Sequence, residues 1–106
     1  MTTTSITSIQ RGIVFLKATW SGGAEWAFPK LVAFLEQHDI PSEQLYVFDV
    51  DQHPELYDLP ELVGKIHGWG EALVIKDGVI VFVTRLGKDQ HLIQEHCDEL
   101  LRFYAA

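Results

Sequence analysis

The apolar positions of this chain predict four strands. Two stretches are continuously apolar, which is typical of strands buried on both faces of a sheet. Two further stretches are rich in β-branched residues and are separated by Asp77-Gly78, a dipeptide that strongly favours a tight hairpin turn. The four predicted strands cover residues 12–18, 45–50, 72–75 and 79–84.

Apolar residues spaced three and four apart predict the helices. One helix is expected over 25–38, where Pro29 removes a backbone hydrogen bond and should kink the helix. A second, irregular helix is expected over 51–68, with Asp51 as its N-cap and an interruption at Pro60. A third is expected over 89–104, where the apolar residues form a single stripe.

The order of these elements is β-α-β-α-β-β-α, which predicts an α/β fold. A right-handed crossover through a helix makes the first two strands parallel, and the hairpin makes the last two antiparallel. We therefore expect a four-stranded mixed sheet with helices on both faces. Residues 12–106 are expected to form one domain, preceded by an N-terminal arm or short helix over 1–11, where Ile6 and Ile9 share a helical spacing.

The amino-acid composition and net charge argue against some classes of binding partner for this chain. The chain has 106 residues, 47% of them hydrophobic, and a formal net charge of −7, so neither nucleic acid nor an anionic membrane surface is an expected partner. No apolar run is long enough to span a bilayer, and residues 1–10 do not form a signal-peptide pattern. A single cysteine, Cys97, suits a reducing compartment, so a cytoplasmic location is expected.

The segment Trp20-Ser21-Gly22-Gly23-Ala24 lies between the first predicted strand and the first helix. It resembles the active-site segment of the thioredoxin family, Trp-Cys-Gly-Pro-Cys, with Ser21 and Ala24 in place of the two cysteines. Several other segments agree with the family in order and spacing. They are Pro29, Asp51-Gln52-His53-Pro54, Ile66-His67-Gly68-Trp69-Gly70, Lys76-Asp77-Gly78 and Gly87. The resemblance implies a thioredoxin-like fold with a shortened N-terminal element.

The departures from the family pattern concern redox chemistry. Thiol-disulfide exchange needs a thiolate nucleophile and a second, resolving thiol, which Ser21 and Ala24 do not supply. The family's buried Asp and nearby Lys correspond to Phe15 and Val47, and its cis-proline corresponds to Gly70. The resemblance therefore implies a redox-inactive member of the family.

Individual residues offer other possible chemistry. Ser21 is either a nucleophile or the N-cap of the helix that follows, and the absence of a nucleophile-elbow pattern favours the cap. Cys97 lies on the apolar stripe of the last helix, which favours a buried and inert thiol, although an oxidoreductase-related enzyme using Cys97 or a partner's thiol is the alternative. The five histidines lack zinc-ligand spacing and no phosphate-binding loop is present, so no metal or cofactor is expected.

The resemblance also implies a binding surface, because in the family the active-site turn, the proline loop and a glycine loop meet at one edge of the sheet and bind an extended peptide. On this chain the corresponding residues are Trp20, Ser21, Gly22, Gly23, Ala24, Val50, Trp69, Gly70, Leu86 and Gly87. The two tryptophans either anchor a partner or fold back over the core. The resulting hypothesis is a protein- or peptide-binding module, such as an assembly factor or chaperone. A homodimer through the hairpin edge at 79–83 is a further alternative.

Overall fold

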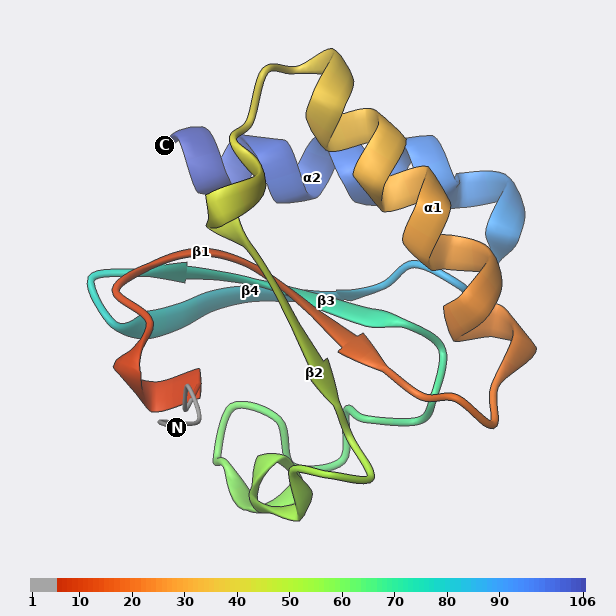
Figure 1. Ribbon diagram of the computed structural model, residues 1–106, viewed down its shortest axis with the longest axis vertical. Coiled ribbons are helices and arrows are strands. Elements are labelled where there is room, and N and C mark those ends of the chain that lie inside the picture. The colour runs from red at the N-terminus through yellow and green to blue at the C-terminus, as the bar shows by residue number, and fades with distance from the viewer. Residues whose placement is uncertain (1–5) are drawn as a thin grey trace.

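The computed structural model describes residues 6–106, and its centre is a four-stranded mixed sheet (Figure 1). The strand order is β2-β1-β3-β4. Strand β1 pairs in parallel with β2 and antiparallel with β3, which in turn pairs antiparallel with β4. This is the mixed sheet that the sequence predicts. The bounds are Arg11–Lys17 for β1, Leu45–Asp49 for β2, Glu71–Lys76 for β3 and Val79–Arg85 for β4.

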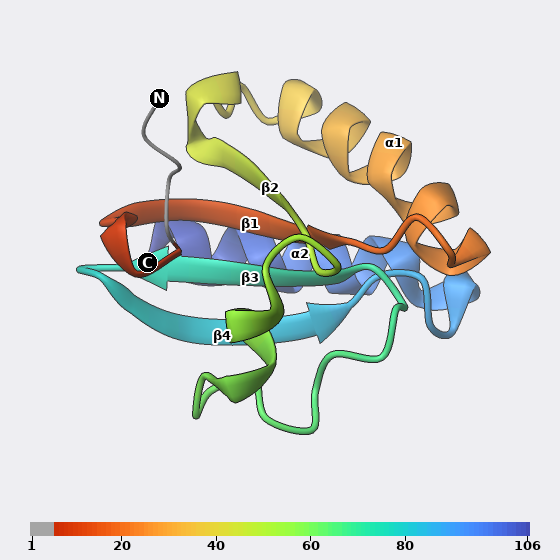
Figure 2. The same ribbon diagram turned by 60° about the horizontal axis from the view of Figure 1, so that its bottom comes forward.

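Two α-helices cover one face of the sheet (Figures 1 and 2). Helix α1 spans Gly22–Gln37 and runs through Pro29, and α2 spans Ile93–Ala105 after a short 3-10 helix, η4, at Gln90–Leu92. The opposite side of the sheet carries two 3-10 helices, η1 at Ile6–Ser8 and η3 at Pro54–Asp58. A third, η2 at Ser42–Gln44, leads into β2.

The α-helix expected over 51–68 is absent, and this prediction was wrong. Only η3 forms there, and turns follow it. Pro60 explains the interruption, because the residue before a proline is driven out of the helical region, and Leu59 has φ −68° and ψ 130°. Asp51 is not the N-cap either: His53 occupies that position without a side-chain capping bond.

The hairpin between β3 and β4 has the turn that its sequence predicts. Asp77 and Gly78 both have positive φ, 53° and 75°, as a two-residue turn matched to the sheet twist requires. Further along, the register moves from Val74↔Phe82 to Ile75↔Ile80, which leaves Val81 without a partner on β3. This β-bulge lies on an edge strand, and such bulges disfavour pairing with another edge.

The core surrounds the central strands on both faces. Residues 12–16 of β1 and 71–75 of β3 are all buried, because α1 and α2 cover one face and the 3-10 segments the other. Ile6 and Ile9 are also buried, so the described part of the predicted arm, residues 6–11, packs on the core; the rest, 1–5, lies outside the described residues. Within residues 6–106, no helix has the length and apolar character to cross a membrane.

Candidate functional site

Three segments far apart in sequence meet at the end of the sheet where α1 begins. The amide of Gly87 donates to the carbonyl oxygen of Trp69 at 2.6 Å, and the amide of Leu86 donates to that of Gly70 at 3.1 Å. The first turn of α1 lies against both, because a Cβ built on Gly87 would be 2.5 Å from the carbonyl oxygens of Gly23 and Trp69. Only glycine fits at position 87 without moving this backbone.

Trp20 is exposed but held by two neighbours. Its side chain is 59% accessible, and its indole Nε1 donates to Oδ1 of Asp51 at 3.3 Å. The ring also packs on Gly68, where an added Cβ would overlap the indole and where φ is +78°. The loop that replaces the expected helix therefore supplies both the hydrogen-bond acceptor of Trp20, on Asp51, and the backbone on which its ring packs, at Gly68.

Trp69 is exposed as well, at 41% accessibility, and its loop is fixed from below by Glu71. The Glu71 side chain is fully buried. Its Oε2 accepts the backbone N–H groups of His67 and Trp69, each at 3.2 Å, and its Oε1 has no partner among residues 6–106. Sequence reasoning missed Glu71, whose only signal is a carboxylate directly before an apolar strand.

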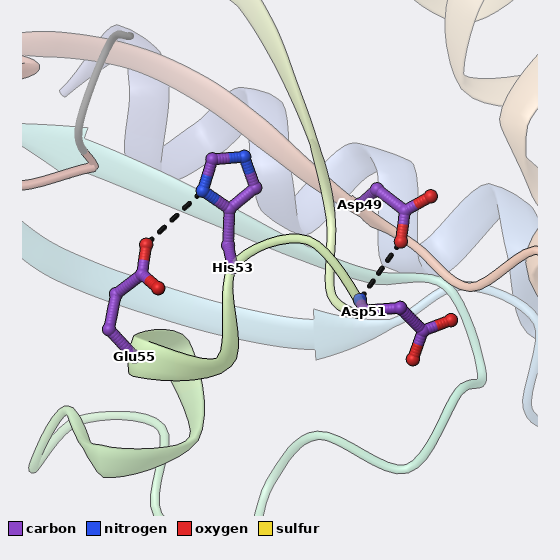
Figure 3. Close-up of polar contacts among 4 residues, drawn as sticks. All are labelled: Asp49, Asp51, His53 and Glu55. Carbon is purple, nitrogen blue, oxygen red and sulfur yellow. Dashed lines mark hydrogen bonds and ion pairs between the residues drawn. The ribbon is translucent and has the colours of Figure 1, made fainter.

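The turn after β2, whose Asp51 binds the Trp20 indole, carries an acidic rim formed by Asp49 and Asp51 (Figure 3). The Oδ1 of Asp49 accepts the backbone N–H of Asp51 at 2.9 Å, which closes the turn after β2. Beside it, the Nδ1 of His53 lies 3.1 Å from Oε1 of Glu55. The carboxylates of Asp49 and Asp51 thus give this side of the surface negative charge. The sequence pattern predicts only a helix N-cap for Asp51.

The Tyr57 phenol lies in the field of two carboxylates, those of Asp51 and Glu71. Partial burial raises the pKa of Tyr57 above its ordinary value of 10.0, and the negative charges of Asp51 and Glu71 raise it further. Tyr57 is 42% exposed, so at neutral pH it presents a protonated hydroxyl, a hydrogen-bond donor, beside the acidic rim.

The ten residues that the sequence assigns to the binding surface differ in how far they are buried. Trp20, Gly22 and Trp69 face solvent, and Ser21 and Gly23 are partly buried. The other five are buried and support the surface from beneath: Ala24, Val50, Gly70, Leu86 and Gly87. The Val50 and Leu86 side chains, at 1% and 0% accessibility, are not exposed on this surface. We call the solvent-facing group, Trp20 to Gly23 together with Trp69, the Trp20–Trp69 surface.

Ser21 and Ala24, the residues in the two cysteine positions, have structural roles. The Ser21 Oγ accepts the Ala24 N–H at 3.4 Å, so Ser21 is the N-cap of α1, as the sequence predicts. This is the only hydrogen bond of the hydroxyl among the described residues. Without an adjacent base, the hydroxyl lacks what a serine nucleophile needs. Ala24 is packed in the core at 1% accessibility.

An apolar pocket lies where the family carries a buried Asp and a Lys. It has a volume of about 320 Å³. Phe15 is fully buried and packs against Phe28 with ring centroids 5.0 Å apart, while Val47 is exposed. These three residues line the pocket together with Lys17, Ala24 and Glu25. The position that corresponds to the family's buried Asp is therefore apolar, because Phe15 occupies it, and the titratable side chains of the pocket lining are Lys17 and Glu25.

Cys97 is buried and poorly suited to act as a nucleophile. Its accessibility is 2%. Burial raises the pKa of its thiol to about 11, with a smaller contribution from Asp98. It lies between α1 and α2, in a groove that also includes Pro29 and Phe34 and none of the Trp20–Trp69 surface. Separately, residues 6–106 contain no group of three or more His, Cys, Asp or Glu side chains arranged to hold a metal ion.

Solved thioredoxin structures share this arrangement of strands and helices. Mitochondrial thioredoxin 3 of Saccharomyces cerevisiae matches with a TM-score of 0.62 at 18% identity, over 90% of this chain and 83% of that one. Plasmodium falciparum thioredoxin matches with a TM-score of 0.59 at 19% identity, over 89% and 85%. Malassezia sympodialis thioredoxin matches with a TM-score of 0.57 at 20% identity, over 92% and 76%.

Sequence comparison adds no closer relationship. No family model matches the chain, and no curated protein sequence matches it. The structural similarity extends over nearly the whole chain at identities of 18–20%, a level that defines the fold rather than the activity. The chain therefore has the thioredoxin-like fold that its Trp20–Ala24 segment predicts.

Proposed function

We propose that this chain is a redox-inactive, thioredoxin-like protein that binds an extended peptide or protein segment on the Trp20–Trp69 surface. The role we assign is that of an assembly factor or chaperone. The observation that carries the proposal is that two exposed tryptophans are each held in place by a carboxylate. Asp51 binds the indole of Trp20, and Glu71 binds the backbone of the Trp69 loop.

The redox-inactive part of the proposal rests on the two cysteine positions. Ser21 caps a helix and Ala24 fills the core, so neither position offers a thiol for exchange. The remaining thiol, on Cys97, is covered, and its pKa of about 11 leaves it protonated at neutral pH. These properties favour binding over catalysis by a thiol of this chain.

The two tryptophans have the properties of interface anchors. Tryptophan is enriched among the residues that dominate binding energy, and such residues are effective when they are ordered before binding. A tryptophan held by a hydrogen bond loses less conformational freedom when a partner arrives. Glycine at 23 leaves room beside Trp69, since a Cβ on Gly23 would lie 3.2 Å from the Trp69 ring.

Backbone groups of the same surface can pair with an extended ligand. The first N–H groups of any helix lack intrahelical acceptors. In α1 the N–H of Ala24 donates to Ser21 Oγ and that of Glu25 to the Ser21 carbonyl. The amides of Gly22 and Gly23 remain for a ligand carbonyl or carboxylate, which suits recognition of a peptide backbone.

The test is selection of binding peptides from a random library, followed by calorimetric measurement of the dissociation constant. Trp20→Ala and Trp69→Ala should each weaken binding about 30-fold, the effect of an interface anchor worth about 2 kcal/mol. Val79→Ala is the matched control, because Val79 is also exposed, at 54%, but begins β4 at the hairpin. Equal affinities for all three variants and the parent chain would refute the proposed surface.

A further inference from the structure

A second pocket, of about 350 Å³, opens beside the edge strand β4 and gathers positive charge. Lys65, Arg85 and Lys88 line it. They are three of only eight Lys and Arg residues in a chain whose formal net charge is −7. Lys65 comes from the turns after η3, Arg85 ends β4, and Lys88 follows it in the next loop. The fold thus concentrates cations from separate segments at one place.

Within residues 6–106, these cations form no ion pair with an acidic side chain. The ion pairs of residues 6–106 join His53 to Glu55 and Arg102 to Glu99, and neither involves the pocket. Asp89 is the one acidic residue that lines it. Three like charges around one hollow repel each other, and the potential they create attracts an anion.

Val83 and a hydrogen-bonded polar pair, Thr84 and His96, line the pocket beside these charges. The Thr84 hydroxyl and the Nδ1 of His96 are hydrogen-bonded at 2.9 Å, which joins the end of β4 to α2. The Nε2 of His96 has no partner among the described residues. When the Thr84 hydroxyl donates to Nδ1, the neutral ring carries its proton on Nε2, so the imidazole adds a hydrogen-bond donor and no negative charge to this wall.

Two of the pocket's cations are close, along the chain or across the sheet, to residues that position Trp69. Lys88 directly follows Gly87, whose amide is bonded to the Trp69 carbonyl, and Arg85 lies opposite Glu71 in the β3–β4 register. Lys88 is therefore next in sequence to a residue that positions Trp69, and Arg85 is paired across the sheet with another. The acidic rim lies elsewhere, at the turn after β2.

We propose that this pocket binds an oxyanion, a carboxylate or a phosphate group. The anion has two possible sources: an acidic group of the peptide bound on the Trp20–Trp69 surface, or a small anion from solution. The first source rests on the proposed function, whereas the pocket's affinity for an oxyanion does not. Lys65, Arg85 and Lys88 hold the group by charge, and Arg85 can also offer two parallel N–H donors to it.

The first experiment uses inorganic phosphate as the probe and the full chain labelled with ¹⁵N. Phosphate is titrated at constant ionic strength, balanced with sodium chloride, and backbone amide shifts are followed by NMR. We expect saturable shifts confined to residues 83–89, Lys65 and His96. The double variant Arg85→Gln/Lys88→Gln should weaken the affinity at least about tenfold, because each lost cation removes a Coulomb attraction of the order that this change represents.

The matched control is Lys30→Gln/Lys76→Gln, which removes the same net charge. Lys30 lies over the Trp26 ring and Lys76 precedes the hairpin turn, so neither lines the pocket. Its phosphate affinity should equal that of the parent chain. Lys65→Gln, in an exposed turn, serves as a second pocket variant should the double variant fold poorly. Shifts that do not saturate, or that the control and pocket variants change equally, would overturn the proposal.

A second experiment distinguishes the two sources. A selected peptide that contains Glu or Asp is compared with its Gln or Asn counterpart. If the pocket holds an acidic group of the peptide, the counterpart binds the parent chain more weakly, and the double variant no longer distinguishes the two. If phosphate binds but the two peptides bind equally, the anion comes from solution. Trp20→Ala should leave the phosphate affinity unchanged, so failure of the peptide surface and failure of the pocket are separate results.

Discussion

Oδ1 of Asp51 accepts a hydrogen bond from the Nε1 of Trp20 at 3.3 Å and so joins two loops that are 31 residues apart. One loop follows β2 and the other precedes α1. Both groups are exposed, so the bond contributes little to the stability of the fold. Its consequence is the orientation of an indole that would otherwise sample several rotamers.

Removal of that acceptor should therefore affect binding more than folding. In Asp51→Ala we expect the affinity for a selected peptide to fall about threefold to tenfold, while the free energy of unfolding changes by less than about 1 kcal/mol. Calorimetry and urea denaturation measure the two quantities. Asp58→Ala, an exposed acidic residue at the end of η3, is the control for charge. A loss of affinity equal to that of the control would show that only charge matters.

Glu71 should be important for stability, because it is fully buried and accepts two backbone hydrogen bonds. Glu71→Ala leaves the N–H groups of His67 and Trp69 without an acceptor and should cost about 2–4 kcal/mol of unfolding free energy. Glu71→Gln keeps an acceptor oxygen and should cost less. Urea denaturation with parallel spectroscopy of the Trp69 environment measures both. A Glu71→Ala variant as stable as the parent chain would contradict this role.

Glycine at position 87 should be indispensable, unlike glycine at position 22. In Gly87→Ala the new Cβ would be 2.5 Å from two carbonyl oxygens, so the segment must move, and we expect a loss of about 2–4 kcal/mol. In Gly22→Ala nothing lies within 4 Å of the Cβ. Because alanine favours the helical conformation, this control should be unchanged or more stable by up to about 1 kcal/mol. Thermal denaturation distinguishes the two variants.

The buried thiol should make stability fall at high pH. Burial raises the pKa of Cys97 from its ordinary value of 9.0 to about 11, so the native state holds this proton more tightly than the unfolded chain does. The resulting stabilisation is complete below about pH 9 and is lost as the pH rises through about 11. Other groups titrate there too, so the measurement is the difference in unfolding free energy between the parent chain and Cys97→Ala. A difference that stays constant from pH 8 to 11 would contradict the raised pKa.

The parent chain should not catalyse disulfide reduction, and two cysteine substitutions should introduce this activity. With dithiothreitol as reductant, we expect no acceleration of insulin reduction by the parent chain. The double variant Ser21→Cys/Ala24→Cys places two thiols at the N-terminus of α1, where the helix dipole lowers a thiol pKa. It should form an internal disulfide, detected by mass spectrometry, and show measurable turnover. Turnover by the parent chain that disappears in Cys97→Ala would instead support the thiol-enzyme alternative.

Local chemistry in the sequence determined most of the secondary structure. The apolar run of residues 13–16 predicts a central buried strand, Asp77-Gly78 predicts a tight turn, and Ser21 predicts a helix N-cap, and each is observed. These features depend on side chains within a few positions of one another, so the local sequence is sufficient to predict them. The same approach was wrong over 51–68, where Leu59 precedes Pro60 and the helical spacing of apolar residues does not form an α-helix.

Tertiary structure decided the properties of the candidate site. Whether Trp20 and Trp69 are exposed could not be read from their positions. Trp20 is held by Asp51 and Gly68 of a distant loop, and the loop of Trp69 is held by Glu71, whose carboxylate is buried only in the folded chain. The carboxylate of Glu71 and the cations beside β4 carry no local pattern at all. Their environment comes from strand pairing and loop packing across tens of residues, and contacts of that range exist only once the chain has folded.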